Sequence, residues 1–128
     1  MDCPACGAET VAFVVPAVLR EYAPGDGSVA AICTTCLRTY ATEAGAIEPA
    51  FGAVTPSFPE GEAGVAFALV LGRLDSLALE REAIVRLCEH AEREGADVLL
   101  ALDRLAADPS VDPHFDLDRR RHQLEQLL

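Results

Sequence analysis

Two short cysteine pairs constrain the fold of this chain more than any other feature. The first is Cys3-Pro4-Ala5-Cys6, followed by Gly7, and the second is Cys33-Thr34-Thr35-Cys36. Each CxxC pair places two thiolates on a tight turn, and a hairpin between the turns brings four sulfurs together. We predict one tetrahedral Zn²⁺ per chain, with four ligands: Cys3, Cys6, Cys33 and Cys36. Four protein ligands leave no position for water or substrate, so this zinc would be structural.

Two details depart from the usual pattern of paired CxxC sites. The pairs lie farther apart than the roughly 15–20 residues of most such sites. Leu37 follows the second pair, whereas Gly7 follows the first, and only glycine takes positive φ without steric cost. A disulfide pair or a thioredoxin-like redox motif is the alternative interpretation. A redox CxxC usually lies in a βαβ pattern, and neither pair is surrounded by one.

The sequence around the cysteines predicts a zinc ribbon over residues 1–46. Four segments have the composition of strands or extended chain: 10–15, 17–22, 29–32 and 38–42. Pro16 interrupts the first of them, so we expect an edge strand there. The resulting antiparallel sheet is too small to bury much apolar surface. We therefore expect metal binding to contribute to the folding of the ribbon.

The rest of the chain is predicted to be helical. Residues 47–58 form a connector rich in Gly, Pro and Ala, with Phe51 and Phe58 as anchors, and 59–128 form a helical domain. Helices are expected at about 59–76, 80–94, 97–107 and 116–128. The fold class is therefore α+β: an N-terminal four-cysteine zinc ribbon followed by a C-terminal bundle of three to four helices.

Local signals support these helices. Ser57 and Glu60 have the spacing of a capping box, and the run 65–71 has no polar face, which is typical of a buried helix. Gly95 suits the end of the second helix, and Asp97 and Asp116 suit the starts of the third and fourth. The short break at Gly95 leads us to expect an antiparallel pair of helices around it.

The charge of the chain is strongly acidic. There are 21 acidic residues against 10 basic ones, all arginine, which gives a net charge of −11. The acid is spread along the chain, as in proteins that work in molar salt, where the Debye length falls to about 3 Å. A GC-rich genome would explain the missing lysine but not the acid. Such a charge disfavours nucleic acid, although less strongly in high salt.

No group of residues predicts catalysis, and we expect no enzyme activity. Cys88 and His90 are two apart on a helix, where side chains point in different directions, so Cys88 is expected in the core. The three histidines show no metal-ligand spacing. The arginines at 119–121 have two interpretations: they contact phosphate, or they form ion pairs with the acidic residues Asp116, Asp118 and Glu125.

The chain resembles a known class of small proteins. The Cys3-Pro4-Ala5-Cys6-Gly7 motif near the start of the sequence, together with Cys33-Thr34-Thr35-Cys36 and the lysine-free acidic background, is similar to the CPxCG-type zinc ribbons of halophilic archaea. The segments 102–109 and 116–121 resemble an uncharacterised haloarchaeal family that joins such a ribbon to helices. The resemblance implies zinc at the four cysteines and carries over no catalytic residue.

These features favour a zinc-binding adaptor or regulator that acts through protein contacts. We expect a protein partner or a homodimer that uses the last helix, in which Leu124, Leu127 and Leu128 are apolar. These leucines could instead close the core of the monomer. The alternative function is a nucleic-acid-associated ribbon of transcription or translation that uses Arg20, Arg38 or the 119–121 cluster. The sequence shows neither a membrane span nor a secretory signal, and we expect a cytoplasmic protein.

Overall fold

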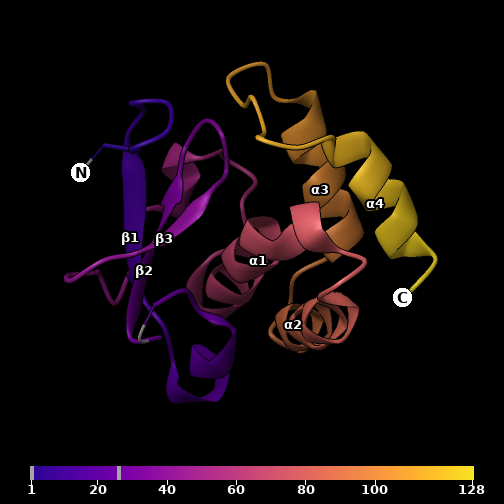
Figure 1. Cartoon of the computed structure of the whole chain (residues 1–128), viewed down its shortest axis with the longest axis horizontal. Helices are drawn as coiled ribbons and strands as arrows, with labels where there is room; N and C mark the ends of the chain where they lie inside the picture. The colour runs from indigo at the N-terminus through magenta and orange to yellow at the C-terminus, as the bar shows by residue number, and fades with distance from the viewer. Residues whose placement is uncertain (1, 26) are drawn as a thin grey trace.

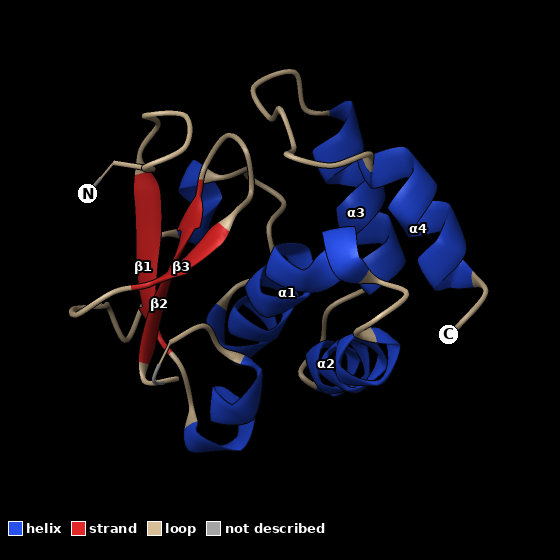
Figure 2. Cartoon of the chain, in the orientation of Figure 1, coloured by secondary structure: helices blue, strands red, loops and turns tan. Residues whose placement is uncertain are grey.

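A small sheet packs against a group of helices in the computed structural model, which describes residues 2–25 and 27–128 (Figures 1 and 2). The strands are β1 (Thr10–Val14), β2 (Val29–Cys33) and β3 (Thr39–Ala41). The α-helices are α1 (Gly61–Arg73), α2 (Arg81–Arg93), α3 (Val98–Ala107) and α4 (Leu117–Glu125). Three 3₁₀ segments complete the described elements: η1 (Ala17–Tyr22), η2 (Phe51–Ala53) and η3 (Leu74–Ser76). The predicted α+β class is confirmed.

The sheet is antiparallel, with β2 in the centre between β1 and β3. Val11 pairs with Ile32 and Phe13 with Ala30, so the alternating side chains of β1 reach the core. Strand β1 lies at an edge of the sheet, as expected. This edge is partly covered, because Ala46 forms a parallel bridge with Phe13. The chain after β3 therefore returns to cover the open edge of the sheet.

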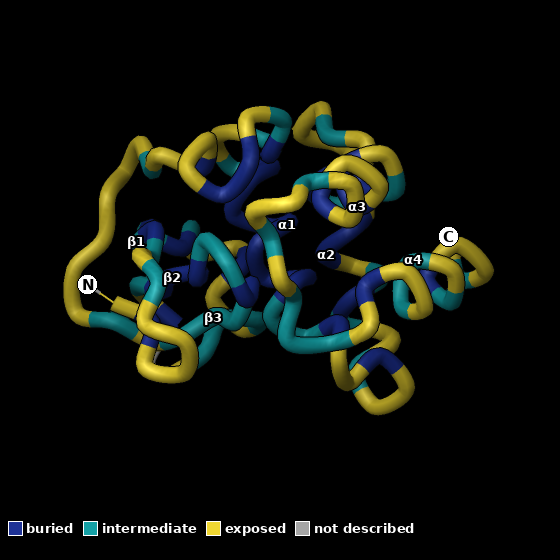
Figure 3. The backbone as a smooth tube through the Cα atoms, turned by 90° about the horizontal axis from the view of Figure 1, so that it is seen from above, coloured by how far each residue is buried: buried dark blue, intermediate teal, exposed yellow. Residues whose placement is uncertain are grey.

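Helix α1 lies at the centre of the molecule, between the sheet and the other helices (Figures 1 and 3). All its residues from Ala63 to Leu71 are buried, as its lack of a polar face predicts. The helix approaches β3 closely at Gly72, where a Cβ would lie 1.9 Å from the Thr39 Oγ1. Only glycine fits this contact, so Gly72 sets how closely the helix packs on the sheet.

The connector joins the sheet to α1 through aromatic rings. Phe51 lies 5.6 Å from Phe13 and 4.9 Å from Phe58, measured between ring centroids, and Phe58 lies 5.1 Å from Phe67. Phe51 and Phe58 are buried, as predicted for anchors. One hydrophobic core thus includes residues of the sheet, the connector and the helices. The boundaries at residues 46 and 58 stay a prediction.

Two local predictions are wrong. Ala17–Tyr22, predicted as extended chain, is the 3₁₀ segment η1, which begins with a bond from the Leu19 N–H to the Pro16 carbonyl. Ala, Leu and Arg favour helical backbone, and burial of Leu19 holds the segment in place. The capping box is also absent: Ser57 belongs to a turn closed by Phe58 and Thr55, and Glu60 is the N-cap without a side-chain bond.

The other helix predictions are close to the structure. Gly95 takes a φ of 103° after α2, and the carboxylates of Asp97 and Asp116 accept the cap hydrogen bonds of α3 and α4. The last helix ends at Glu125, before the predicted Leu128. The antiparallel arrangement of α2 and α3 is wrong, because α2 is seen end-on in Figure 1 whereas α3 lies across the view. Helix α2 packs mainly on α1 instead.

Candidate metal centre

The first cysteine turn is built by local backbone bonds. The Cys3 N–H donates to the Ala8 carbonyl at 2.7 Å, and the Gly7 N–H donates to the Cys3 carbonyl at 2.8 Å. Gly7 has a φ of 80°, the positive value that we expect of a glycine after CxxC. The turn therefore presents Cys3 and Cys6 on the same side, directly before β1.

The second cysteine turn is the hairpin between β2 and β3. In this turn the backbone N–H groups of Thr35 and Cys36 donate to the Cys33 Sγ, each at 3.4 Å. Leu37 has a φ of 67°, so it adopts the conformation that Gly7 adopts in the first turn. Its side chain is fully buried in the main core. Burial of Leu37 thus offsets the steric cost that glycine would avoid.

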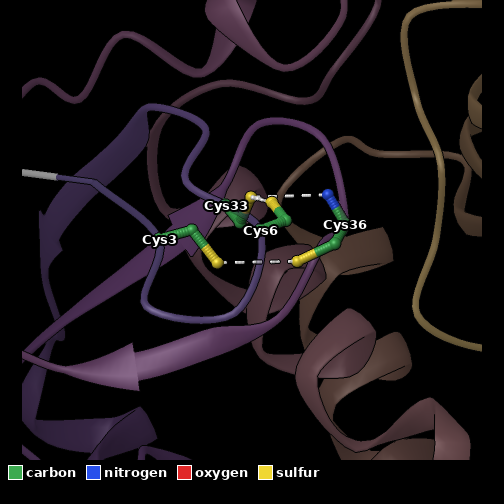
Figure 4. Close-up of side chains that lie close together, drawn as sticks. All are labelled: Cys3, Cys6, Cys33 and Cys36. Carbon is green, nitrogen blue, oxygen red and sulfur yellow. Dashed lines mark hydrogen bonds between the residues drawn. The ribbon is translucent and has the colours of Figure 1, made fainter.

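The two turns bring the four cysteine sulfurs together (Figure 4). The Sγ atoms of Cys3 and Cys36 are 3.7 Å apart, those of Cys6 and Cys33 are 3.4 Å apart, and all four lie within 4.8 Å of one another. A tetrahedron with metal–sulfur bonds of about 2.3 Å has edges of about 3.8 Å. The four side chains therefore fit one tetrahedral ion, and the cluster could hold a metal.

Hydrogen bonds around the cluster favour the thiolate of Cys3, whereas the pKa of Cys33 is raised by burial. The Tyr40 hydroxyl lies 3.1 Å from the Cys3 Sγ. Burial opposes ionisation of Cys3, but bonds from Tyr40 and from the backbone of Cys6 and Ala5 outweigh it and lower its pKa to about 6. A side-chain hydrogen bond to Cys36 raises the pKa of Arg38. The guanidinium of Arg38 thus lies where it can balance negative sulfur.

A loop from the helical half is hydrogen-bonded to the second turn. The Asp112 N–H donates to the Thr35 carbonyl at 2.8 Å, and the His114 N–H donates to the Cys36 carbonyl at 2.9 Å. The His114 Nδ1 lies 2.8 Å from the same Cys36 oxygen. A carbonyl only accepts, so Nδ1 carries the proton. The loop between α3 and α4 is therefore part of the surroundings of the cluster.

The remaining candidates from the sequence lie elsewhere. Cys88 is fully buried, and burial raises the pKa of its thiol to about 12, so it is placed in the core as predicted. Arg121 forms ion pairs with Asp103 and Glu125, and Arg120 lies 3.9 Å from the carboxylate of Asp75. These pairs agree with the ion-pair interpretation of the 119–121 cluster. Of the partners, Glu125 is expected from the sequence, whereas Asp75 and Asp103 are not.

Sequence reasoning missed two sets of residues. Tyr40 and His114 are too far from their cysteines in the chain for any spacing to reveal the contact. A second group of metal-ligand type brings together Glu62, His90 and Glu94. His90 lies on α2 and Glu94 is the C-cap residue four positions later, so both lie on one face, a spacing that a search for pairs of histidines overlooks.

A comparison with family models decides the relationship of the chain. Residues 2–128 match the model of a family of unknown function, DUF6276. The chain belongs to this family. No curated protein and no solved structure matches it. Membership of this family therefore assigns no activity to the chain.

None of the helices in the described residues is long and apolar enough to cross a bilayer.

Proposed function

We propose that this protein is a non-enzymatic, zinc-binding adaptor or regulator. The observation that carries the proposal is the convergence of four sulfurs within 4.8 Å, from two turns, under a loop of the helical half. Four sulfur ligands leave an ion no open position, which suits a structural role. The ion would then hold the first turn, the second turn and, through His114, the loop between α3 and α4 in one arrangement.

Zn²⁺ is the ion that the donor set favours. Four thiolates in a tetrahedral arrangement bind zinc or iron in preference to the hard cations that bind oxygen. Zinc has no redox chemistry of its own and is the usual ion of paired CxxC turns. The protein would take up one zinc per chain through Cys3, Cys6, Cys33 and Cys36.

Elemental analysis tests this part of the proposal. We expect about one zinc per chain to survive dialysis against a chelator, because a closed thiolate site releases its ion slowly. The Cys33→Ser variant should lose this zinc, and Cys88→Ser should retain it, since Cys88 is buried outside the cluster. Iron in place of zinc, or chelator-resistant zinc in Cys33→Ser, would contradict the assignment.

Exposed apolar side chains support a role through protein contacts. Leu79 is 90 % exposed and Val18 is 59 % exposed. Val18 lines a groove of about 820 Å³ between η1 and α2, and Leu79 lines a neighbouring hollow of about 520 Å³. Both hollows also share Tyr22. Contiguous apolar patches mark surfaces that bind proteins, and we propose that Val18, Leu79 and Tyr22 form such a patch here.

The last helix remains our proposed contact for a partner or a homodimer. Leu128 is 47 % exposed, whereas Leu124 is buried and Leu127 packs against the core. Deletion of residues 122–128 would therefore remove core residues as well, and Leu128→Asp is a cleaner test. We expect sedimentation in molar KCl to show association that Leu128→Asp weakens. If Leu79→Asp weakens it instead, the groove carries the contact and the last-helix proposal fails.

The alternative function is binding to nucleic acid, and the positive charge that it needs is partly engaged. Arg120 and Arg121 already form ion pairs, and Arg38 is directed at Cys36, so these arginines are partly neutralised. Binding of phosphate backbones depends on unpaired positive charge. Affinity capture in native salt should therefore give the same partners with and without nuclease. Loss of all partners after nuclease treatment would replace the adaptor with the nucleic-acid alternative.

We further infer that the protein works in molar salt in the cytoplasm of a halophilic archaeon. Support comes from the net charge of −11, the absence of lysine and the resemblance of the cysteine motifs. No disulfide joins Cys3, Cys6, Cys33, Cys36 or Cys88. Cysteines without disulfides suit a reducing compartment.

A further inference from the structure

We propose that Glu62, His90 and Glu94 form a second metal site, which binds a divalent transition ion of the Zn²⁺ class. One ligand atom of each residue lies within 4.8 Å of the ligand atoms of the other two. The His90 Nε2 and the Glu62 Oε2 are 2.6 Å apart. The site is separate from the four cysteines, and it does not depend on the function proposed for them.

The packing of two helices fixes the three ligands. His90 and Glu94 are separated by one turn at the C-terminal end of α2, so both side chains lie on one face. Glu62 lies in the first turn of α1, and α1 and α2 pack extensively on each other. Ala63 and Ala91, which adjoin Glu62 and His90 in the sequence, are buried. Glu62 and His90 are therefore held by a contact between two packed helices, and Glu94 follows His90 by one turn at the exposed end of α2.

The electrostatics of α2 favour a cation here. Glu94 is the C-cap residue, and its N–H donates to the His90 carbonyl at 3.1 Å. The C-terminus of a helix carries partial negative charge, which disfavours a carboxylate and favours a cation. A bound ion would offset both the negative helix end and the two carboxylates. Glu62 lies in the first turn of α1, so its carboxylate reaches the site from the other helix.

The donor set indicates the class of ion and how it binds. One imidazole nitrogen and two carboxylate oxygens suit Zn²⁺ and its neighbours, whereas Ca²⁺ and Mg²⁺ prefer oxygen alone. Three protein ligands leave at least one position for water, unlike the closed cysteine site. His90 lines the groove of about 820 Å³, and Glu94 lines a hollow of about 250 Å³. Ions can therefore reach the ligands from solvent and exchange with it.

A simple hydrogen bond between His90 and Glu62 is the competing explanation. His90 and Glu62 would then join α1 to α2 as they stand, and their side chains are only 13 % and 35 % exposed. In that case Glu94 would take no part in the contact and would bind no ion. Substitution of Glu94 therefore separates the two explanations, and because Glu94 is exposed the variant should stay folded.

The test is calorimetric titration with Zn²⁺ of protein that already holds its chelator-resistant zinc. We expect one further, weaker Zn²⁺ per chain, and a rise in melting temperature as it binds. Glu94→Gln and His90→Gln should each weaken this second binding at least tenfold. Glu89→Gln is the matched control, because it removes the same charge from α2 outside the cluster.

Three results would overturn the proposal. The first is wild-type protein that binds no second Zn²⁺. The second is equal binding by Glu94→Gln, Glu89→Gln and the wild type, which would leave only the hydrogen bond between His90 and Glu62. The third is binding of Ca²⁺ as tight as that of Zn²⁺, which would indicate unspecific attraction to acidic groups. Loss of the chelator-resistant zinc would instead concern the cysteine site, so the two failures are distinguishable.

Discussion

At the scale of single residues, Leu37 shows two opposing effects at one position. A left-handed backbone costs a non-glycine residue roughly 1–2 kcal/mol. Complete burial of a leucine side chain contributes about 1.5–3 kcal/mol. With a φ of 67° and a fully buried side chain, Leu37 experiences both. The second cysteine turn therefore uses leucine to attach the cysteine cluster to the main core.

Substitution of Leu37 should separate these effects. Leu37→Ala removes the buried side chain but keeps the backbone cost, so we expect a loss of about 2–5 kcal/mol in the free energy of unfolding. Leu37→Gly should lose about 1 kcal/mol less, because glycine removes that cost. Urea unfolding with zinc present measures both. The control is Leu102, buried within α3, where Gly should be worse than Ala. If Leu37→Gly is less stable than Leu37→Ala, the account of this turn is wrong.

Cys88 leads to a prediction about pH. Burial raises the pKa of its thiol to about 12, whereas a cysteine thiol in an unfolded chain has a pKa of about 8.5. Above that pH the unfolded chain loses a proton that the folded chain keeps, so stability falls as pH rises. Relative to Cys88→Ala, the wild type should lose on the order of 1 kcal/mol per pH unit between about pH 9 and 11. Equal slopes in urea unfolding would contradict burial of the thiol.

At the scale of elements, the loop between α3 and α4 links the cluster to the helical half. Its bonds are those of Asp112 to Thr35 and of His114 to Cys36. Hydrogen bonds to a carbonyl next to a metal ligand hold that ligand in position. The position of the loop and the retention of the metal should therefore depend on each other.

His114→Ala should weaken this link. We expect it to lower the free energy of unfolding by about 0.5–1.5 kcal/mol and to speed the transfer of zinc to a chelator severalfold. His114→Asn keeps a donor near the position of Nδ1 and should restore part of the effect. His122→Ala, an exposed histidine on α4, is the control. Transfer rates that are equal in His114→Ala, His122→Ala and the wild type would show that the loop does not support the cluster.

The sequence predicts those elements whose signals are local. The caps at Asp97 and Asp116 and the glycine after α2 act within one turn of the chain, and all three predictions are confirmed. The clustering of the four cysteines follows from the turn geometry of two CxxC pairs. The capping box fails because Ser57 is engaged in an earlier turn, a competition that spacing alone does not reveal.

Contacts between distant segments are what the sequence could not predict. The bond between His114 and Cys36 joins residues 78 apart, and the pair of Glu62 and His90 joins residues 28 apart. Both depend on how α1, α2 and the loop before α4 pack, which is decided by the whole core. Periodicity and capping describe each helix separately, so they leave its neighbours undetermined.

At the scale of the whole molecule, the stability of the fold depends on the main hydrophobic core and on the net negative charge. The core joins the sheet to the helices through Phe13, Phe51, Phe58 and Phe67. The net charge of −11 is distributed along the chain around this core. Like charges on a compact surface repel one another, and salt screens the repulsion. The folded state should therefore gain stability relative to the unfolded chain as salt rises.

The melting temperature should rise with KCl and continue to rise into the molar range. Screening shortens the Debye length from about 10 Å at 0.1 M to about 3 Å at 1 M, and exclusion of salt from apolar surface adds to the effect at higher concentration. Sucrose is the control, because it is excluded from the surface without screening charge. A melting temperature that is unchanged between dilute buffer and molar KCl would contradict adaptation to high salt.

The central claim is that four cysteine sulfurs hold one structural zinc, and X-ray absorption at the zinc edge tests it most directly. The sample is Glu94→Gln with one equivalent of Zn²⁺, so that the second proposed site does not contribute. The account predicts four sulfur neighbours at about 2.3 Å. In Cys33→Ser, whose serine replaces one ligand of the cluster, the four-sulfur signal and the folded ribbon should both be lost. A zinc ion surrounded mainly by nitrogen or oxygen, or a native fold in Cys33→Ser without zinc, would contradict the claim.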